Sequence, residues 1–566
     1  MALAPLALVP GGFARFVVAP LLVVSVAIAV GARARATGRL PAAVVGVVGA
    51  GSLVLLVAAL ASVSPAAALL GRWPRYEGVV VLGLYVASAW LGARLLGGER
   101  HPATATTLLR ATAVGALVLA AFSVLDALGA SPLGGTDATR PGALLGNATD
   151  QGIVAMIAMA VLLRPALTDR QALHVAGLVA SVLTIGLAGS RAVIGAAAVV
   201  VVVHLAAGVR GGRRPLLLVL GGLVAVVAIL PQARERLLGF HTVTGRSVLW
   251  TESLELGLDH PWLGVGPSGF VDAIPRYHDD DWVERVGVAA PPDSPHLWLL
   301  QAWSAGGLLL VLLAVALAGL IAALGWRGVR RRPDDPLVLG LFAATVGYGL
   351  VLSTHFTIAG TTPWAAFLAG GLIAAAARES RSPLPLATSV AAGTAAVVLL
   401  AACVGEVVIR DGVDAAAAGR GAAADRSFEI AAGWRPWDVD LPLIAAQALA
   451  GATSGGDESA VDPTVRWAAR SLELTPDSST AGLALAVALL RRGELAEALQ
   501  VLDGVVALAP TDPQAHVQRA LARFGLQDGA GAVDDLERAV ELDPEDPTAA
   551  DLLEQIEQRL AGPPGD

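Results

Sequence analysis

The 566-residue sequence has no lysine, one cysteine and few charged or aromatic residues. All 39 basic residues are therefore arginines, as a GC-rich coding sequence would favour. Only 15% of the residues are charged, against about 25% in a typical soluble protein. The lone thiol, Cys403, excludes a disulfide framework and a cysteine-rich metal site. The formal net charge of −8 comes largely from an acidic tail, and nothing in it indicates nucleic-acid binding.

What the sequence has instead is a series of apolar runs between about residue 13 and residue 408, each near the roughly 20 residues of a transmembrane helix. We predict about twelve spans, over residues 13–32, 41–64, 77–97, 105–127, 150–167, 171–188, 191–209, 214–231, 296–325, 336–354, 361–377 and 385–408. No small-residue cleavage site precedes a polar domain, so the first run is interpreted as a span and not as a cleaved signal peptide. The predicted fold is all-α, with a polytopic membrane bundle over residues 1–410 and a second unit over residues 411–566.

Arginines occur in alternate connections between these spans. They are residues 33, 35 and 39; 94 and 100; 164 and 170; 210, 213 and 214; 327 and 330–332; and 378 and 381. The positive-inside rule places these connections in the cytoplasm. The other connections then face outward, the longest of them being residues 232–295. With an even number of spans, residues 411–566 also lie outside the cytoplasm. One span more or fewer would place them inside.

Arg191 interrupts an apolar run, TIGLAGSRAVIGAAAVVVVVHL (184–205), that is long enough to cross a bilayer. A charge at the bilayer centre costs about 2.5 to 3.5 kcal/mol on insertion scales, so intramembrane arginines usually have a function. Gly189 and Ser190 favour a tight break, which puts Arg191 at a turn between two spans on the exported side. Two interpretations stay open: an arginine that snorkels to the interface, and an arginine that binds a ligand.

A candidate base, His296, follows the exported segment. Ser294 and Pro295 favour a helix N-cap and a first helical position, which puts His296 in the first turn of the next span. The helix dipole would there disfavour an imidazolium. A lone histidine at a helix start is usually an ordinary interfacial residue, but Arg191, Arg246 and His296 can share one outer face. His355, in STHFTI, and His260 are lower-ranked alternatives for a base.

Three patterns inside the exported segment need an interpretation. Trp250, Leu254 and Leu258 recur at helical spacing, which predicts an amphipathic helix on the membrane surface. GVGPSG (264–269) has the glycine spacing of a dinucleotide-binding loop, but no βαβ context surrounds it and a proline interrupts it, so we exclude that function. HDDD (278–281) is interpreted as a solvated loop and not as a metal site.

The motifs GSRA, GRSVLW…DHPWLGVGPSGF and SPHLWLLQAWSAGGLL, in that order, resemble the bacterial O-antigen ligase and O-antigen polymerase superfamily of GT-C-type membrane glycosyltransferases. The likeness covers roughly residues 40–380, with RWPRYEG (72–78) and GN (146–147) as weaker matches. It implies transfer of a glycan from undecaprenyl pyrophosphate to an acceptor hydroxyl outside the cytoplasmic (inner) membrane. No metal or cofactor is implied.

By the same resemblance, His296 is the catalytic histidine, and Arg191 and Arg246 are the arginines that hold the diphosphate. Arg72 and Asn147 are further candidate substrate-binding residues. The family often has asparagine directly after the histidine, where this sequence has Leu297, whose side chain forms no hydrogen bond. The chemistry agrees: guanidinium groups bind phosphates in a bidentate manner, a positioned base contributes about 10²–10⁴ in rate, and direct displacement would invert the anomeric centre.

The tail contains an internal repeat. LTPDS, LAPTD and LDPED place Pro476, Pro510 and Pro544 at intervals of 34 residues, the period of tetratricopeptide repeats, which stack into an α-solenoid. GWRPWDVD, around Pro436, is interpreted as an earlier, degenerate unit. The repeats are either a docking surface for a glycan acceptor, a protein or another assembly subunit, or a stable solenoid without a ligand.

Several functions fit these observations. A ligase would move a finished chain onto a lipid, protein or wall polymer, and a polymerase would add it to another carrier-linked repeat unit. A transporter or flippase for the same lipid-linked glycan is an alternative, but we find no similarity between the two halves of the bundle, and the key charges lie toward its outer rim. A membrane-anchored scaffold would leave Arg191 and His296 unexplained.

Overall fold

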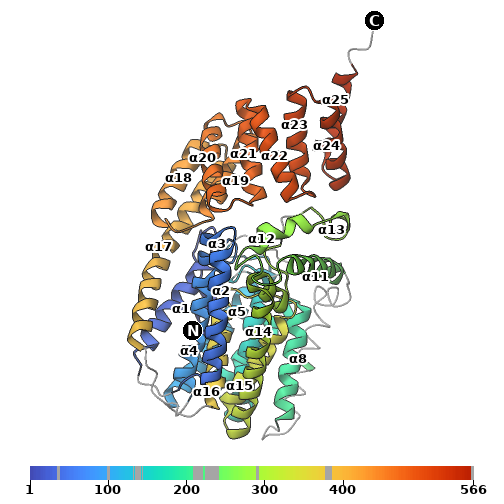
Figure 1. The fold of residues 1–566 in the computed structure, drawn as a ribbon. Helices are drawn as coiled ribbons and strands as arrows, with labels where there is room; N and C mark the ends of the chain where they lie inside the picture. The colour runs from blue at the N-terminus through green and yellow to red at the C-terminus, as the bar shows by residue number, and fades with distance from the viewer. Residues whose placement is uncertain are drawn as a thin grey trace.

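The computed structural model describes residues 1–34, 38–97, 102–131, 133, 142, 144–207, 219, 221–222, 241–288, 292–376 and 385–561. In these residues every regular element is a helix. The helices form a bundle, and an arched solenoid of helix pairs stands over one end of it (Figure 1). The predicted all-α fold is therefore confirmed.

The bundle helices correspond to the predicted spans. They are α1 (Val18–Gly31), α2 (Ala42–Ala61), α4 (Val79–Leu96), α5 (Pro102–Ala127), α6 (Ala148–Thr168), α7 (Ala172–Ala188), α8 (Arg191–Ala206), α14 (Trp298–Arg331), α15 (Pro336–Val351), α16 (Thr362–Ala375) and α17 (Pro385–Ala417). In the described part of the chain, six helices are long and apolar enough to cross a membrane: α2, α4, α5, α6, α14 and α17. The other five are shorter apolar helices. Arg35, Arg100, Arg210, Arg213, Arg214, Arg378, Arg381 and almost all of the predicted span 214–231 lie outside the described residues, and the number of crossings stays a prediction.

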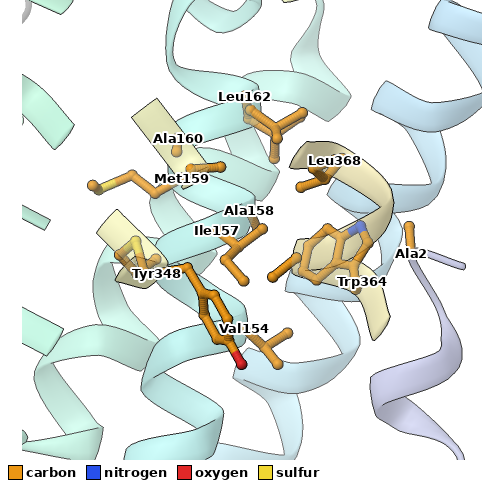
Figure 2. Close-up of a cluster of buried hydrophobic side chains, with 14 of the residues drawn as sticks. Ala2, Val154, Ile157, Ala158, Met159, Ala160, Leu162, Tyr348, Trp364 and Leu368 are labelled. Atoms are coloured by element: carbon orange, nitrogen blue, oxygen red, sulfur yellow. The ribbon is translucent and has the colours of Figure 1, made fainter. Parts of the chain in front are cut away.

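Helix α6 is the centre of the bundle. All its residues from Ala148 to Ala166 are buried, against α5, α7, α8 and α15. Figure 2 shows Val154 and Ile157 of α6 beside Tyr348 of α15 and Trp364 of α16. A helix that is apolar on all sides can be enclosed in this way by neighbouring helices.

Helix α14 is interrupted, which corrects the prediction of one continuous span over residues 296–325. Gly306 and Gly307 have non-helical backbone angles, so residues 298–305 form a short helix of their own before the span. The interruption frees backbone groups for the exported segment: Val265 N donates to Ser304 O at 2.8 Å, and Leu308 N donates to Pro261 O at 2.9 Å. Residues 261–265 therefore pack against the interruption at Gly306 and Gly307.

The described part of the exported segment contains α11 (His241–Asp259), α12 (Phe270–Ala273), a 3₁₀ turn (Ile274–Tyr277) and α13 (Asp280–Arg285). The helix predicted around Trp250 is confirmed as α11. Val248 and Leu256 are buried, whereas Leu254 and Leu258 are exposed. The position of this helix on the membrane surface stays a prediction.

The aspartates of HDDD do not converge. Asp279 caps α13 by accepting from Trp282 N, Asp280 pairs with Arg538, and Asp281 pairs with Arg285. Within the described ranges, no group of three or more histidine, cysteine or carboxylate side chains is arranged to hold a metal ion.

The solenoid consists of α18 (Gly421–Trp434), α19 (Leu441–Ser454), α20 (Val461–Leu474), α21 (Ser479–Arg492), α22 (Leu495–Leu508), α23 (Pro513–Gly525), α24 (Gly529–Leu542) and α25 (Pro547–Leu560). The residues before the repeated prolines, Thr475, Ala509 and Asp543, share one C-cap conformation with φ between −136° and −141°. Arg435, before Pro436, has φ −132°, in agreement with an earlier degenerate unit. The expected boundary at residues 410–411 falls within α17, which runs on from the bundle.

Ion pairs join the solenoid to the end of the bundle that carries the exported segment (Figure 1). Asp440, before α19, accepts from the guanidinium of Arg72 at 2.5 Å. Arg538 on α24 pairs with Asp280 at 2.6 Å, and Arg276 pairs with Asp477 at 2.9 Å. The solenoid and the exported segment therefore lie on the same side of the bundle.

Candidate functional site

His296 lies in a tight turn that ends two residues before α14. The expectation that it sits in the first turn of the helix is wrong, because the N-cap is Leu297 and His296 has φ +53°, in the left-handed region. Ser294 shapes the turn rather than the helix: its Oγ accepts from His296 N at 3.2 Å and donates to Gln301 Oε1 at 2.7 Å. A left-handed conformation is uncommon for a residue other than glycine, and such residues cluster at functional sites.

Two neighbours hold this turn from outside. The Nε1–H of Trp250, on α11, donates to Pro295 O at 3.0 Å. The N–H of Trp298 donates to the carbonyl of Leu352, just after α15, at 3.2 Å. The turn is therefore fixed between the exported segment and the end of α15.

Burial, and not a helix dipole, keeps His296 unprotonated. Burial lowers its pKa to about 4, and the electrostatic effects of His355, Arg246 and Arg75 act in the same direction against an opposing effect of Asp293. Its Nδ1 atom is buried without a hydrogen-bond partner. The imidazole is thus unprotonated at neutral pH, as a proton acceptor must be.

A second imidazole lies beside the first. The ring centroids of His296 and His355 are 6.4 Å apart, and both rings contact Phe356, at 4.9 Å and 4.2 Å. His355 Nε2 is 2.9 Å from Oδ1 of Asp150, in the first turn of α6. Both side chains of this pair are buried, with 5% and 3% exposure.

Arg75, which sequence reasoning did not select, anchors the His296 turn. Its guanidinium donates to Asp293 Oδ2 at 2.6 Å and to Asp293 O at 2.5 Å, and a third bond of 3.0 Å reaches Glu77. The same group lies over the ring of Phe356, 5.1 Å from its centroid. Arg75 belongs to the motif RWPRYEG, so the signal was present, but Arg72 was the arginine chosen from it.

Of the two arginines proposed to hold the diphosphate, Arg246 on α11 lies close enough to lower the pKa of His296. Arg191 is the first residue of α8, after Ser190 as N-cap and the left-handed Gly189 that ends α7, as the tight break predicted. The starts of α8 and α6 lie side by side, because a Cβ on Gly152 would be 3.2 Å from Val193 Cγ1. Arg191 and Asp150 are thus at the same end of the bundle.

The two weaker candidates have structural partners. Arg72 is 5% exposed and pairs with Asp272 and Asp440, so its guanidinium joins the bundle, the exported segment and the solenoid. Asn147 is the N-cap of α6, and its Oδ1 accepts from Thr149 N at 2.8 Å. We therefore propose supporting roles for both residues, and a substrate contact by either stays untested.

Two parts of the chain match models of known protein families. Residues 176–315 match the family model described as O-antigen ligase. This part of the chain is similar to an O-antigen ligase domain. The match includes Arg191, Arg246 and His296, and it supports a membrane enzyme of the ligase or polymerase type. Residues 485–557 match the tetratricopeptide repeat, which confirms the interpretation of the 34-residue period.

Solved structures are also similar to parts of this chain. MamA 41-end from Desulfovibrio magneticus RS-1 is 25% identical over 28% of this chain and 85% of its own length, with a TM-score of 0.24. The first TPR domain of human RPAP3 is 26% identical over 22% of this chain and 95% of its own, with a TM-score of 0.20. These scores are too low to compare arrangements. No curated protein matches the chain.

Proposed function

We propose that this O-antigen ligase-like protein transfers a glycan from undecaprenyl pyrophosphate to an acceptor hydroxyl on the outer face of the cytoplasmic membrane. The observation that carries the proposal is a buried, unprotonated His296 in a constrained turn beside Arg246, within the region that matches the O-antigen ligase family. A base of this kind suits a hydroxyl acceptor, whose proton must leave as the new glycosidic bond forms.

In the proposed reaction the acceptor oxygen attacks the anomeric carbon while the bond from that carbon to the diphosphate oxygen breaks. His296 accepts the hydroxyl proton, and the diphosphate departs with the bonding electron pair. Arg246 and Arg191 bind the diphosphate, whose negative charge grows as it leaves, and charge-assisted bonds to guanidinium groups are stronger than neutral ones. A single displacement of this kind inverts the anomeric configuration.

The outer face is proposed from the arginine pattern of the sequence. The exported segment, His296 and the solenoid share one end of the bundle, so they lie on the same side of the membrane whichever side that is. The tetratricopeptide repeats would then be extracytoplasmic. There they are available to a glycan, lipid or protein acceptor, or to a protein partner.

Polymerisation of repeat units is the alternative within the same family, because a polymerase uses the same donor and differs in its acceptor. The match to an O-antigen ligase domain includes all three residues of the proposed site and favours an enzyme over a transporter or flippase. The products separate the two enzymes. A polymerase lengthens carrier-linked glycan, whereas a ligase releases the carrier and labels a different molecule.

The test uses purified full-length protein and undecaprenyl-pyrophosphate-linked glycan extracted from the source membranes, together with those membranes as the source of acceptor. We expect transfer by the wild type and a loss of at least 100-fold in His296→Gln, in line with removal of a general base. His260→Gln should stay within about twofold of wild type, since His260 is an exposed residue outside the His296 cluster. Full activity of His296→Gln would refute the base assignment.

A further inference from the structure

The pair of His355 and Asp150 has no role in the reaction described so far. The carboxylate lies in the first turn of α6, where the positive end of the helix dipole stabilises an anion. A buried carboxylate also needs a hydrogen-bonded partner, and imidazole Nε2 of His355 provides it at 2.9 Å. Because Nε2 is used in this way, Nδ1 is the ring nitrogen left for a substrate.

The contacts of the neighbouring segments place the imidazole of His355 at the edge of the proposed site. The segment that carries it contacts the His296 turn through the Trp298–Leu352 backbone bond, and it contacts the RWPRYEG loop through Thr357, which donates to Glu77 at 2.7 Å. On its other side stands the start of α6, which packs against the start of α8. The imidazole of His355 thus lies between His296 and the helix that begins with Arg191.

The two histidines have opposite electrostatic environments. His296 faces the cations of Arg246 and Arg75, with Asp293 as the nearby carboxylate. The ring of His355 is hydrogen-bonded to a carboxylate on α6. Paired titratable groups whose environments differ in this way commonly divide the acid and base roles of a reaction.

We propose that His355, oriented by Asp150, is a second catalytic imidazole that donates a proton to the departing diphosphate while His296 accepts the acceptor proton. The inference rests on the proposed glycan transfer. The bond from the acceptor oxygen to the anomeric carbon forms, and the bond from that carbon to the diphosphate oxygen breaks. The diphosphate oxygen keeps the electron pair and takes the Nδ1 proton of His355. Water then reprotonates His355 and removes the proton from His296, so that both imidazoles return to their starting states.

Asp150 is a positioning residue in this scheme, because it acts through His355. Asp150→Asn keeps the shape of the side chain and removes its charge. His355→Gln keeps an N–H donor for Asp150 and removes the transferable proton. The matched control is His278→Gln, since His278 Nδ1 lies 2.8 Å from Glu252 Oε2 in an equally buried pair within the exported segment.

The first measurement is the steady-state kinetics of glycan transfer by the purified full-length variants. We expect kcat to fall about 10²-fold in His355→Gln and Asp150→Asn, with little change in donor KM. A loss in kcat at unchanged donor KM places the effect in the chemical step, which a merely structural residue would not do. His278→Gln should reduce thermal stability and leave kcat and donor KM unchanged. Near-wild-type kcat in folded His355→Gln, or an equal fall in kcat in His278→Gln, would overturn the proposal.

The second measurement, binding of inorganic pyrophosphate, needs no glycan. Loss of the hydrogen bond from His355 should weaken pyrophosphate binding about tenfold in His355→Gln, with no effect in His278→Gln. Equal pyrophosphate affinity in wild type and His355→Gln would overturn the contact with the diphosphate. If wild type binds pyrophosphate through His355 but transfers no glycan, the proposed function fails and the anion contact stands.

Discussion

Trp250 donates a hydrogen bond from its indole nitrogen to the carbonyl of Pro295, at 3.0 Å. The bond joins α11, which carries Arg246, to the residue directly before His296. The proposed diphosphate ligand and the proposed base therefore have a fixed relationship, although 50 residues separate them in the sequence. Positioning of this kind matters because misplacement by about 1 Å can reduce an enzymatic rate 10²-fold.

Trp250→Phe should lower kcat about tenfold or more while the protein stays folded, because phenylalanine fills most of the space without the N–H group. The lost hydrogen bond should reduce the free energy of unfolding by about 1 kcal/mol. Trp434→Phe is the control, as Trp434 is an exposed tryptophan of the solenoid. Equal rates for Trp250→Phe and wild type would show that the bond does not position His296.

Glycan transfer should keep its rate at mildly acidic pH. Since burial and neighbouring cations lower the pKa of His296 to about 4, the acid limb of kcat/KM should have its midpoint near pH 4 and not near 6.5, the usual pKa of histidine. Between these two pH values the unfolded chain binds a proton at this position that the folded chain does not, so the free energy of unfolding should fall with decreasing pH. His296→Gln should lose that component. An acid limb centred above pH 6 would contradict the assignment.

The helices were predictable, because long apolar runs and a 34-residue proline period each dictate one kind of element. The break at Gly306 and Gly307 was not, since a local pattern cannot reveal that Val265 and Pro261 satisfy the freed backbone groups. The start of α14 was misplaced because Ser294 caps a turn instead of a helix. Arg75 and Asp150 were passed over because a buried ion pair depends on partners more than 200 residues away, such as Asp293 and His355.

Arg72→Ala should separate the solenoid from the bundle. The substitution leaves the carboxylates of Asp272 and Asp440 without their cation, and breaking a buried ion pair costs about 3–5 kcal/mol. We expect a lower melting temperature and faster proteolysis at the junction around residues 418–440.

The exposed pair at the same junction provides the control. Arg276 and Asp477 are 43% and 38% exposed, and a surface ion pair contributes only about 0–1 kcal/mol. Arg276→Ala should therefore leave both the melting temperature and the proteolysis pattern close to wild type. If the two variants behave alike, the burial of Arg72 does not determine the strength of the junction.

Gly307→Ala should impair folding and transfer together. Gly307 has φ +70°, and a Cβ built on it would lie 2.0 Å from Trp262 O, on the backbone of the exported segment. The substitution would therefore push that segment away from α14 and disturb the bonds from Val265 and Leu308. Gly319→Ala on the same helix is the matched control, since nothing lies within 4 Å of its Cβ and alanine favours a helix by about 1 kcal/mol. Thermal unfolding in detergent should rank the control at or above wild type and Gly307→Ala well below it. Equal melting temperatures for the two variants would mean that the close approach at Gly307 is not needed to hold the exported segment.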